Sequence, residues 1–227
     1  MKIAYFTQNP VSVSETFFSF LVRGLSEKAG NDSIIHVVGS KSGERLIENT
    51  FFSNFNLNFL GLRLLYEFEE RSGLNSQVAL NWAQRTASKR LAKLKRFGKP
   101  DVAHIEYGNT AIRIYKYLVE NNIPFVVHYH GKDASAEFIS PTYARESRKV
   151  FNAARFVVTA SEHVKRLLVI RGCDENKIKV IRYGVETNKL QPISWDERFK
   201  SNPSLVFLGR LTEKKNPLAL IHAFKLV

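Results

Sequence analysis

Two residues that could do chemistry, His130 and Asp133, follow a short apolar segment near the middle of the chain. Residues 125–130 are β-prone, with Pro124 in front and Gly131 behind, and this pattern predicts a buried strand that stops abruptly. Ligands of open α/β sheets bind outside the carboxyl ends of the strands, so His130 and Asp133 are expected at a binding rim. Gly131 would let another group approach the backbone closely. The alternative is that His130 caps the strand and Asp133 caps the next helix.

The loop after the first expected strand is a second place for chemistry. A helix is expected from about residue 15 to residue 28, with Ser14 as its N-cap, which puts Ser14, Glu15 and Thr16 at a helix amino terminus. Such an end receives phosphate or other anions. The chain contains neither G-x-G-x-x-G nor G-x-x-x-x-G-K-[ST], which argues against a conventional dinucleotide site and against a P-loop NTPase.

The elements that must position these residues alternate between strand and helix. This alternation predicts an α/β fold, a Rossmann-like parallel sheet with helices on both faces. Residues 40–75 have mixed periodicity and are expected to be irregular, with a strand or a short helix. The expected strands lie at 2–6, 33–38, 101–108, 125–130, 154–159 and 177–182, and the expected helices at 15–28, 76–97, 109–121, 142–152 and 161–171.

The character of the chain changes near its carboxyl end. Residues 186–204 are polar, contain two prolines and lack a sustained period, so they are interpreted as a linker between domains. Residues 1–185 then form one domain. Residues 205–227 begin a second one with an expected strand at 205–208, a loop and a helix from residue 218.

The helix expected at residues 76–97 is amphipathic and basic. Between Arg85 and Lys99 the chain has seven basic residues and no acidic one, and Arg85, Lys89, Lys93 and Arg96 lie on one face of the expected helix. A basic amphipathic helix suits an anionic membrane surface. The alternative is the solvated face of an ordinary crossover helix.

Composition narrows the classes of protein further. The chain has 227 residues, 44% of them hydrophobic, which is enough for a packed core. Its net charge of +13 points to an anionic partner: nucleic acid, a phosphorylated substrate or an acidic membrane face. A single cysteine forms no internal disulfide, which favours a reducing cytoplasm. No apolar run approaches the roughly 20 residues of a membrane span, and the amino terminus has no signal-peptide core.

Several segments together resemble one family. Residues 205–224, "LVFLGRLTEKKNPLALIHAF", are similar to the strand, G-R-L-x-x-x-K loop and helix that open the carboxyl-terminal domain of GT-B glycosyltransferases of family 4. Supporting matches are "HGKD" at 130–133, the "SE" pair at 161–162 and "VIRYGVE" at 180–186. The "SETF" at 14–17 resembles a subgroup that builds bacterial exopolysaccharides.

The resemblance implies roles for particular residues. The donor would be a nucleotide-sugar, with its pyrophosphate held by Arg210 and Lys215 in the loop that Gly209 begins, where fixed cations stabilise the developing negative charge. His130 would lie near the transferred sugar in a positioning or polar-stabilising role. No nucleophile, cofactor or metal is implied. The acceptor side of the cleft would include these residues: Ser14, Glu15, Thr16, Glu106, Gly131, Asp133, Glu162 and Gly184.

The chain departs from the family pattern in three places. The usual Gly-Gly is absent from the first loop, the pattern "H-x-H-F-G" becomes "HIEYG" with Glu106 in place of a histidine, and the E-x7-E stretch that holds the donor sugar and ribose is missing. The sequence is therefore expected to be truncated early in the carboxyl-terminal domain.

Three functions are compatible with these observations. The first is a retaining transferase that adds a sugar to a lipid-linked glycan, docking from the cytoplasm on the inner face of the membrane. The second is a non-catalytic remnant that keeps only an acceptor-binding module. The third, a nucleic-acid binder, is suggested by the basic charge but lacks any RRM, KH, zinc or helix-turn-helix signature.

Overall fold

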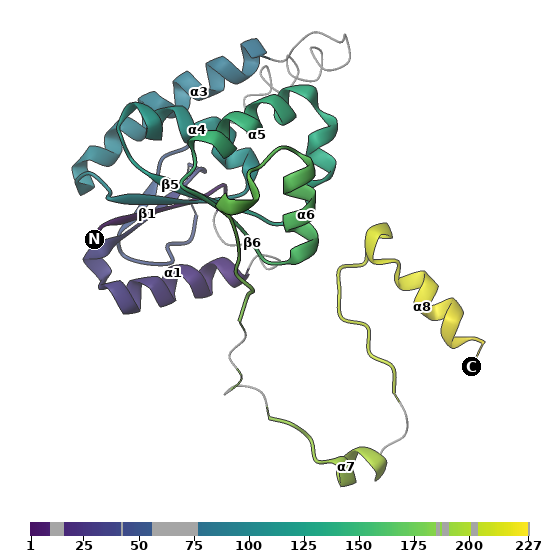
Figure 1. Ribbon diagram of the computed structural model, residues 1–227. Coiled ribbons are helices and arrows are strands. Elements are labelled where there is room, and N and C mark those ends of the chain that lie inside the picture. Colours follow the sequence, from purple (N-terminus) through teal and green to yellow (C-terminus); the bar gives the residue numbers. More distant parts are fainter. Residues whose placement is uncertain are drawn as a thin grey trace. The chain divides into compact units, whose positions relative to one another are not determined.

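The computed structural model describes residues 1–9, 16–41, 43–55, 77–184, 187, 191–200 and 204–226. The chain separates into two compact units, Met1–Tyr183 and Gly184–Val227, and each is described by itself (Figure 1). None of the described helices combines the length and the apolar character needed to cross a membrane.

The first unit is built on a seven-stranded sheet in the order β3-β2-β1-β4-β5-β6-β7. Every neighbouring pair is parallel, which confirms the expected fold class. The strands are β1 (Ile3–Thr7), β2 (Ile34–Val38), β3 (Thr50–Phe52), β4 (Val102–Glu106), β5 (Phe125–Tyr129), β6 (Phe156–Thr159) and β7 (Ile178–Val180).

Helices cover both faces of this sheet. Figure 1 shows α3, α4 and α5 on one face and α1 on the other, and α6 packs against β6 and β7. The helices of this unit are α1 (Thr16–Ala29), α3 (Gln77–Leu91), α4 (Gly108–Glu120), α5 (Pro141–Ala153) and α6 (Glu162–Ile170).

The apolar core lies between the sheet and the α3, α4 and α5 layer. Alternate residues of each strand point to this side because a strand repeats every two residues. The helices supply apolar residues at three- and four-residue steps. The result is one continuous cluster that includes Phe6, Leu91, Ile105, Ile114 and Val127, each at most 1% exposed.

Serine side chains cap two helices of this unit. The Ser161 hydroxyl accepts a hydrogen bond from Val164 N at 3.3 Å and so caps α6. Ser140 caps α5 in the same way, ahead of Pro141 in the first turn.

The helix expected at residues 76–97 has two parts. α3 ends at Leu91, and the 3₁₀ helix η2 (Ala92–Phe97) continues from it. In η2, residues three apart eclipse one another, so the side chains of Lys93 and Arg96 project in directions that differ from those in a continuous α-helix. The irregular segment expected at 40–75 contains β3, and residues 56–76 lie outside the described part.

The second unit contains two short helices in its described residues, α7 (Trp195–Lys200) and α8 (Pro217–Phe224). α8 begins after Asn216, whose side chain accepts a hydrogen bond from Ala219 N at 3.2 Å. The strand predicted at 205–208 is absent: these residues have no strand assignment, and Leu208 is 98% exposed. A strand needs a neighbour to pair with, and the described residues of this unit supply none. The linker expected at 186–204 also contains α7, which the sequence analysis did not predict.

Candidate functional site

The candidate site lies where β4 and β5 end side by side. In the parallel register, Glu106 stands beside His128, and Tyr5 of β1 stands beside His104. Since alternate residues of a strand share a face, these four side chains lie on the same side of the sheet. His130 follows the last residue of β5 by one position and joins them.

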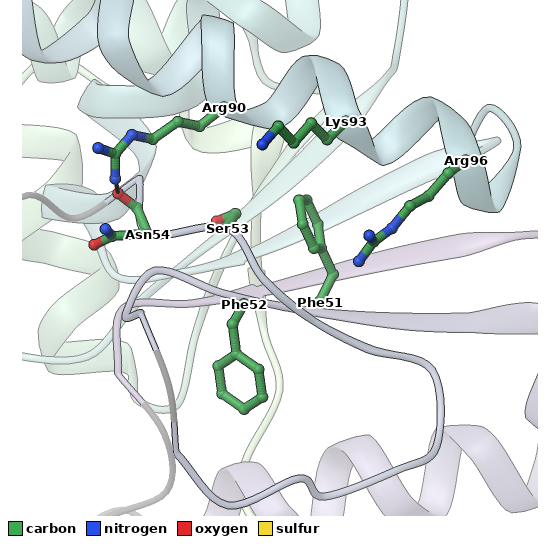
Figure 2. Close-up of a pocket in the computed structure, with 7 residues that line it drawn as sticks. All are labelled: Phe51, Phe52, Ser53, Asn54, Arg90, Lys93 and Arg96. Carbon is green, nitrogen blue, oxygen red and sulfur yellow. Dashed lines mark hydrogen bonds between the residues drawn. The ribbon is translucent and has the colours of Figure 1, made fainter.

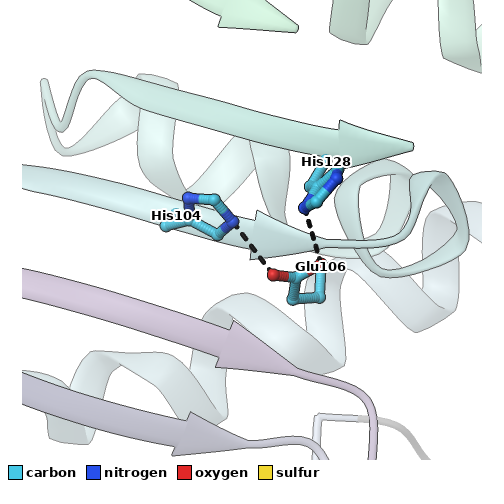
Figure 3. A group of neighbouring side chains, drawn as sticks. All are labelled: His104, Glu106 and His128. Atoms are coloured by element: carbon cyan, nitrogen blue, oxygen red, sulfur yellow. Dashed lines mark hydrogen bonds and ion pairs between the residues drawn. The ribbon is translucent and has the colours of Figure 1, made fainter. Parts of the chain in front are cut away.

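Glu106 is the centre of the cluster and is fully buried. Its carboxylate accepts hydrogen bonds from the Tyr5 hydroxyl, from His104 Nε2 at 3.0 Å and from His130 Nε2 at 2.7 Å. His128 Nδ1 lies 3.4 Å from the same oxygen that His130 contacts. Figure 3 shows the His104 and His128 rings on either side of this carboxylate. A buried carboxylate is thus surrounded by four donor groups, which offsets the cost of taking its charge out of water.

The protonation of this carboxylate follows from its surroundings. Burial raises the pKa of Glu106, but the hydrogen bonds from His104 and His130 and the nearby His128 ring outweigh burial and hold the pKa well below its usual range. Burial and the neighbouring Glu106 charge raise the pKa of the Tyr5 hydroxyl well above its usual range. Glu106 is therefore ionised and Tyr5 is neutral near neutral pH. Since an ionised carboxylate can only accept, Nε2 of His104 and of His130 carries a hydrogen.

Tyr183 holds the other side of His130. Its hydroxyl lies 2.6 Å from His130 Nδ1 and 3.2 Å from His128 Nε2, and the Tyr183 and His130 rings are nearly parallel, at 5°, with their centroids 6.1 Å apart. Both nitrogens of His130 therefore have a partner, so the plane of the ring is fixed. A carboxylate behind an imidazole orients the ring and stabilises a positive charge on it.

Two aromatic side chains flank the same ring. The centroid of Tyr107 lies 4.3 Å from that of His130, and Phe18 of α1 contacts both in edge-on arrangements. Tyr107 has φ 69°, a region that residues other than glycine rarely adopt, and such strain is held only where the surrounding structure enforces it. His130 itself is 14% exposed, so the cluster presents one polar ring at the rim.

Asp133 organises the turn after β5. Its buried carboxylate accepts hydrogen bonds from His130 N at 2.9 Å, from Gly131 N at 3.0 Å and from Gly108 N at 3.0 Å. Gly108 is the first residue of α4, so Asp133 satisfies the amino terminus of that helix rather than that of the helix after it in the chain. The interpretation of Asp133 as a cap was correct in kind, but the capped helix is the preceding one.

The glycines at this turn differ in what they permit. A Cβ on Gly131 would meet open space, so no other part of the described chain approaches the backbone there, and the close approach of another group stays a prediction. A Cβ on Gly108 would lie 2.2 Å from the Tyr143 hydroxyl and 2.4 Å from the Tyr129 ring. Gly108 is thus the position where only glycine fits between α4 and its neighbours.

A metal ion could use part of the cluster. Ligand atoms of His104, Glu106 and His128 all lie within 4.8 Å of one another, and two imidazoles with a carboxylate are a donor set that zinc accepts. In the structure, however, the Glu106 oxygens already accept hydrogen bonds from Tyr5, His104 and His130. A metal ion bound here would have to replace at least the hydrogen bond from His104 to Glu106.

The other residues proposed for the site fall in different places. Thr16 begins α1, while Ser14 and Glu15 lie outside the described residues. Glu162 is exposed in the first turn of α6, and no contact with the Glu106 cluster is found among the described residues. Gly184, Gly209, Arg210 and Lys215 belong to the second unit, where all four are exposed and Lys215 ends a 3₁₀ turn just before α8. Arg85, Lys89, Lys93 and Arg96 are exposed on α3 and η2, and none of them contributes to the Glu106 cluster among the described residues.

Several members of the cluster escaped the sequence analysis. The sequence patterns do not indicate His128 or Tyr183 as site residues, and they indicate Tyr5 only as a strand residue. The usable signal was the i, i+2 spacing of His104 with Glu106 and of His128 with His130, since two such pairs on adjacent strands share a face. Tyr183 has no comparable signal because it lies 53 residues from His130 in the chain.

The fold and the strand-end cluster define a Rossmann-like α/β protein with a polar site at the carboxyl edge of its sheet. Residues 33–189 match the model of Glycosyltransferase Family 4, and this is more than half of the chain. The chain belongs to that family.

A curated relative and two solved structures are similar to the chain. The chain is 27% identical over 137 residues to the uncharacterized glycosyltransferase MJ1069 of Methanocaldococcus jannaschii, covering 59% of this chain and 31% of that protein. Among solved structures, HepE of Anabaena, determined in complex with UDP-glucose, superposes with a TM-score of 0.58 at 16% identity, covering 83% of this chain and 45% of that one. The apo galactosyltransferase WaaB of the lipopolysaccharide outer core gives a TM-score of 0.54 at 12% identity, covering 84% and 48%.

These proteins are longer than the chain. It spans about a third of the curated relative and less than half of the two solved structures. The structural likeness supports the fold, and the match to the family model supports family membership.

Proposed function

We propose that the protein containing this chain transfers a sugar from a nucleotide-sugar donor, with retention of configuration, to a growing lipid-linked bacterial surface polysaccharide of the exopolysaccharide type. In this reaction the bond between the sugar and the nucleoside diphosphate breaks, an acceptor oxygen forms the new glycosidic bond and loses its proton, and the nucleoside diphosphate leaves. The observation that carries the proposal is the pair of Glu106 and His130 at the strand ends of a family 4 chain.

In this proposal, residues 1–185 form the acceptor-side domain, 186–204 the linker and 205–227 the start of the donor-binding domain. His130 positions the transferred sugar or stabilises charge beside it, and Glu106 keeps the ring in the required orientation. Ser14, Glu15, Thr16, Gly131, Asp133, Glu162 and Gly184 are proposed for the acceptor side of the cleft. Asp133 acts there through the backbone turn that it holds.

Donor binding is proposed for the loop of Gly209, Arg210 and Lys215. Arginine offers a planar fork of donors and lysine a compact charge, and both suit a pyrophosphate. The position of Lys215 immediately before Asn216, which caps α8, supports this role because helix amino termini favour anions.

The test is sugar transfer by the protein in its native length, as read from its gene, with a panel of nucleotide-sugars and membrane-derived acceptor. Arg210→Ala and Lys215→Ala should each lower turnover on the order of 10²–10³-fold, because each removes a donor to a developing negative charge. His130→Ala should lower turnover by a similar factor. Lys225→Ala, an exposed change in the same unit as Arg210 and Lys215, is the control and should leave turnover unchanged. Near-normal turnover in all three site variants would contradict the proposal.

A second candidate is a non-catalytic acceptor-binding module. It is favoured by the second unit, where the described residues form no strand and Leu208 and Leu211 are 98% and 82% exposed. We expect the 227-residue polypeptide to lack full turnover by itself. Robust sugar transfer by that polypeptide, with a nucleotide-sugar and the native acceptor, would rule the binding module out.

The proposed location is the cytoplasm, with peripheral binding to the inner face of the cell membrane. Arg85, Lys89, Lys93 and Arg96 are all exposed, and each cation near an anionic surface contributes about 1 kcal/mol. Sedimentation with anionic and neutral vesicles, at low and high salt, tests this. Replacing all four with Gln should reduce binding to the anionic vesicles, and equal binding to both vesicle types would show that the face is only solvated.

A further inference from the structure

A pocket lies at the edge of the sheet, between the residues that end and follow β3 and the helical segment made of α3 and η2. It encloses about 430 Å³, within the range of small-molecule sites. The pocket residues are Phe51, Phe52, Ser53, Asn54, Arg90, Lys93 and Arg96. None of them belongs to the cluster around Glu106.

Three cations converge on this pocket from one side. Figure 2 shows the side chains of Arg90, Lys93 and Arg96 reaching from the helical segment toward the segment that carries Phe51 and Asn54. Their spacing of three residues keeps them on one side, because residues three apart eclipse in the 3₁₀ helix η2 that carries Lys93 and Arg96. The pocket residues include no carboxylate, and within the described part of the chain no ion pair joins these cations to an acidic side chain.

Two of the three cations are held in place before any ligand arrives. The Arg90 Nη1 atom donates a hydrogen bond to the Asn54 carbonyl at 2.6 Å. The Arg96 guanidinium lies 4.8 Å from the centroid of the Phe51 ring and 4.7 Å from that of Phe97. Such cation–π contacts restrict the side chain without neutralising its charge.

The opposite wall is also fixed. Both the backbone N and the hydroxyl of Ser53 donate to the Val38 carbonyl, at 2.9 and 3.0 Å. The backbone N of Asn54 donates to the Ser40 carbonyl at 3.0 Å. These bonds tie the pocket wall to β2 and to the residues that follow it, so the cations face a preorganised surface rather than a free loop.

Like charges gathered without a counter-charge repel one another, and an anion relieves that repulsion. Arginine and lysine together recognise phosphate oxygens through fork-shaped and point-charge contacts. We infer that the pocket between Phe51–Asn54 and η2 binds the phosphate group of a phosphorylated ligand. The volume leaves room for more than the phosphate itself, with Phe51 as an apolar wall.

The test compares two double variants with equal charge change. Lys93→Gln with Arg96→Gln removes two pocket cations. Arg85→Gln with Lys89→Gln removes two exposed cations from the same helical segment that do not line the pocket. The probe is inorganic phosphate, with pyrophosphate as a second probe, titrated by calorimetry and by phosphorus NMR at low salt.

We expect saturable binding in the wild type at millimolar phosphate, at least tenfold weaker binding in the pocket variant and a change below twofold in the control variant. Equal weakening in both variants would show a diffuse charge effect and overturn the pocket. Binding that survives fully in the pocket variant would place the phosphate elsewhere, for example at Arg210, and would also overturn it. Circular dichroism and thermal melts of both variants confirm folding, since all four residues are exposed.

Vesicles separate the two sources of phosphate. If the ligand is a lipid headgroup, the wild type should bind phosphatidylcholine vesicles that contain phosphatidic acid, and the pocket variant should not. Pyrophosphate should then release the wild type from these vesicles. If the ligand is soluble, pyrophosphate should bind while vesicle binding is the same in the two double variants. Either pattern supports the phosphate pocket. Neither depends on sugar transfer, so this inference and the proposed function can fail independently.

Discussion

The two faces of the parallel sheet are built from different chemistry. The face beneath α3, α4 and α5 is apolar, and its strand residues include Ala4, Phe6, Ile35, Val37, Ala103, Ile105, Val127 and Val157. The face toward α1 carries polar side chains at many of the alternate positions, namely Tyr5, His36, His104, Glu106 and His128, beside the buried apolar Ile34 and Val38. Both sets are buried to a similar extent, except for His104 at 25% exposed.

Equal burial has different consequences on the two faces. Apolar side chains gain stability in proportion to the area removed from water, whatever the pH. Buried titratable groups lose solvation, so their stability depends on hydrogen bonds that match one protonation state. We therefore expect the apolar face to set the stability of the unit and the polar face to set its dependence on pH.

The largest effect should come from the apolar face. Phe6→Ala on the interior strand β1 should lower the free energy of unfolding by about 3–5 kcal/mol, because it leaves a cavity in the apolar core. Urea unfolding at pH 6 and pH 8 should give the same loss. Phe20→Ala, at a side chain that is 54% exposed, is the control and should cost far less. A loss that changes between these pH values would break the proposed contrast between the faces.

The next effect concerns the charge at the centre of the polar face. Glu106→Gln keeps the shape but removes the anion that accepts hydrogen bonds from two histidines, so stability at pH 7 should fall by about 2–3 kcal/mol. Because the pKa of Glu106 is depressed in the folded state, its contribution is present above about pH 4.5 and is lost as the pH falls below that value. Unfolding curves at pH 7, 5 and 3.5 measure this.

The control for that experiment is Glu120→Gln at the exposed end of α4. It should leave both the stability and its pH dependence nearly unchanged. If Glu106→Gln retained the steep loss of the wild type below pH 4.5, another carboxylate would be responsible.

The third effect is a loss of stability between pH 6.5 and pH 4.5 that comes from His36 on the polar face. Burial lowers the pKa of His36 from 6.5 to about 4, and its Nε2 atom lies 2.9 Å from the Thr7 hydroxyl. The unfolded chain therefore takes up a proton before the folded chain does, and stability present above pH 6.5 is lost as the pH falls toward 4. The expected loss from this residue is about 2 kcal/mol between pH 6.5 and pH 4.5.

His36→Gln should remove that part of the pH dependence, which shows as a smaller stability change over the same interval. His163→Gln, at an exposed position on α6, should not. If the free energy of unfolding changed equally with pH in the wild type and in both variants, His36 would not be the group that titrates.

The smallest effect is expected at the rim. Tyr183→Phe removes the hydroxyl that contacts His128 and His130 but keeps the ring, so stability should fall by about 1 kcal/mol or less. The informative readout is nitrogen NMR of the imidazoles: the His128 and His130 signals should shift while that of His163 stays in place. Unchanged His130 signals would show that the hydroxyl does not hold this ring.

Much of the fold could be predicted from local patterns. The segment 125–130, with Pro124 before it, was correctly predicted as a buried strand, and the helix expected at 161–171 is α6. Such signals work because caps, breakers and periodicity act over a few residues. The break between α3 and η2 had no comparable signal, since the apolar spacing continues through Leu91 and Leu94.

The site was predicted in part. His130, Asp133 and Glu106 were placed at strand ends, and the structure puts them together. The hydrogen bonds of Asp133 to Gly108 and of Tyr183 to His128 and His130 join distant segments, and no local rule specifies them. Gly108 was passed over because the steric need for glycine comes from Tyr129 and Tyr143, which other elements bring there.

The sequence by itself determined the alternation of strands and helices, the family and the candidate residues at the ends of β4 and β5. These depend on short-range periodicity and on motifs, which are properties of neighbouring residues. Only the tertiary structure decided that Glu106 is buried among Tyr5 and three histidines, and that Arg90 joins Lys93 and Arg96 around a pocket. The physical reason is that burial and charge proximity depend on strand register and helix packing, which bring together residues far apart in the chain.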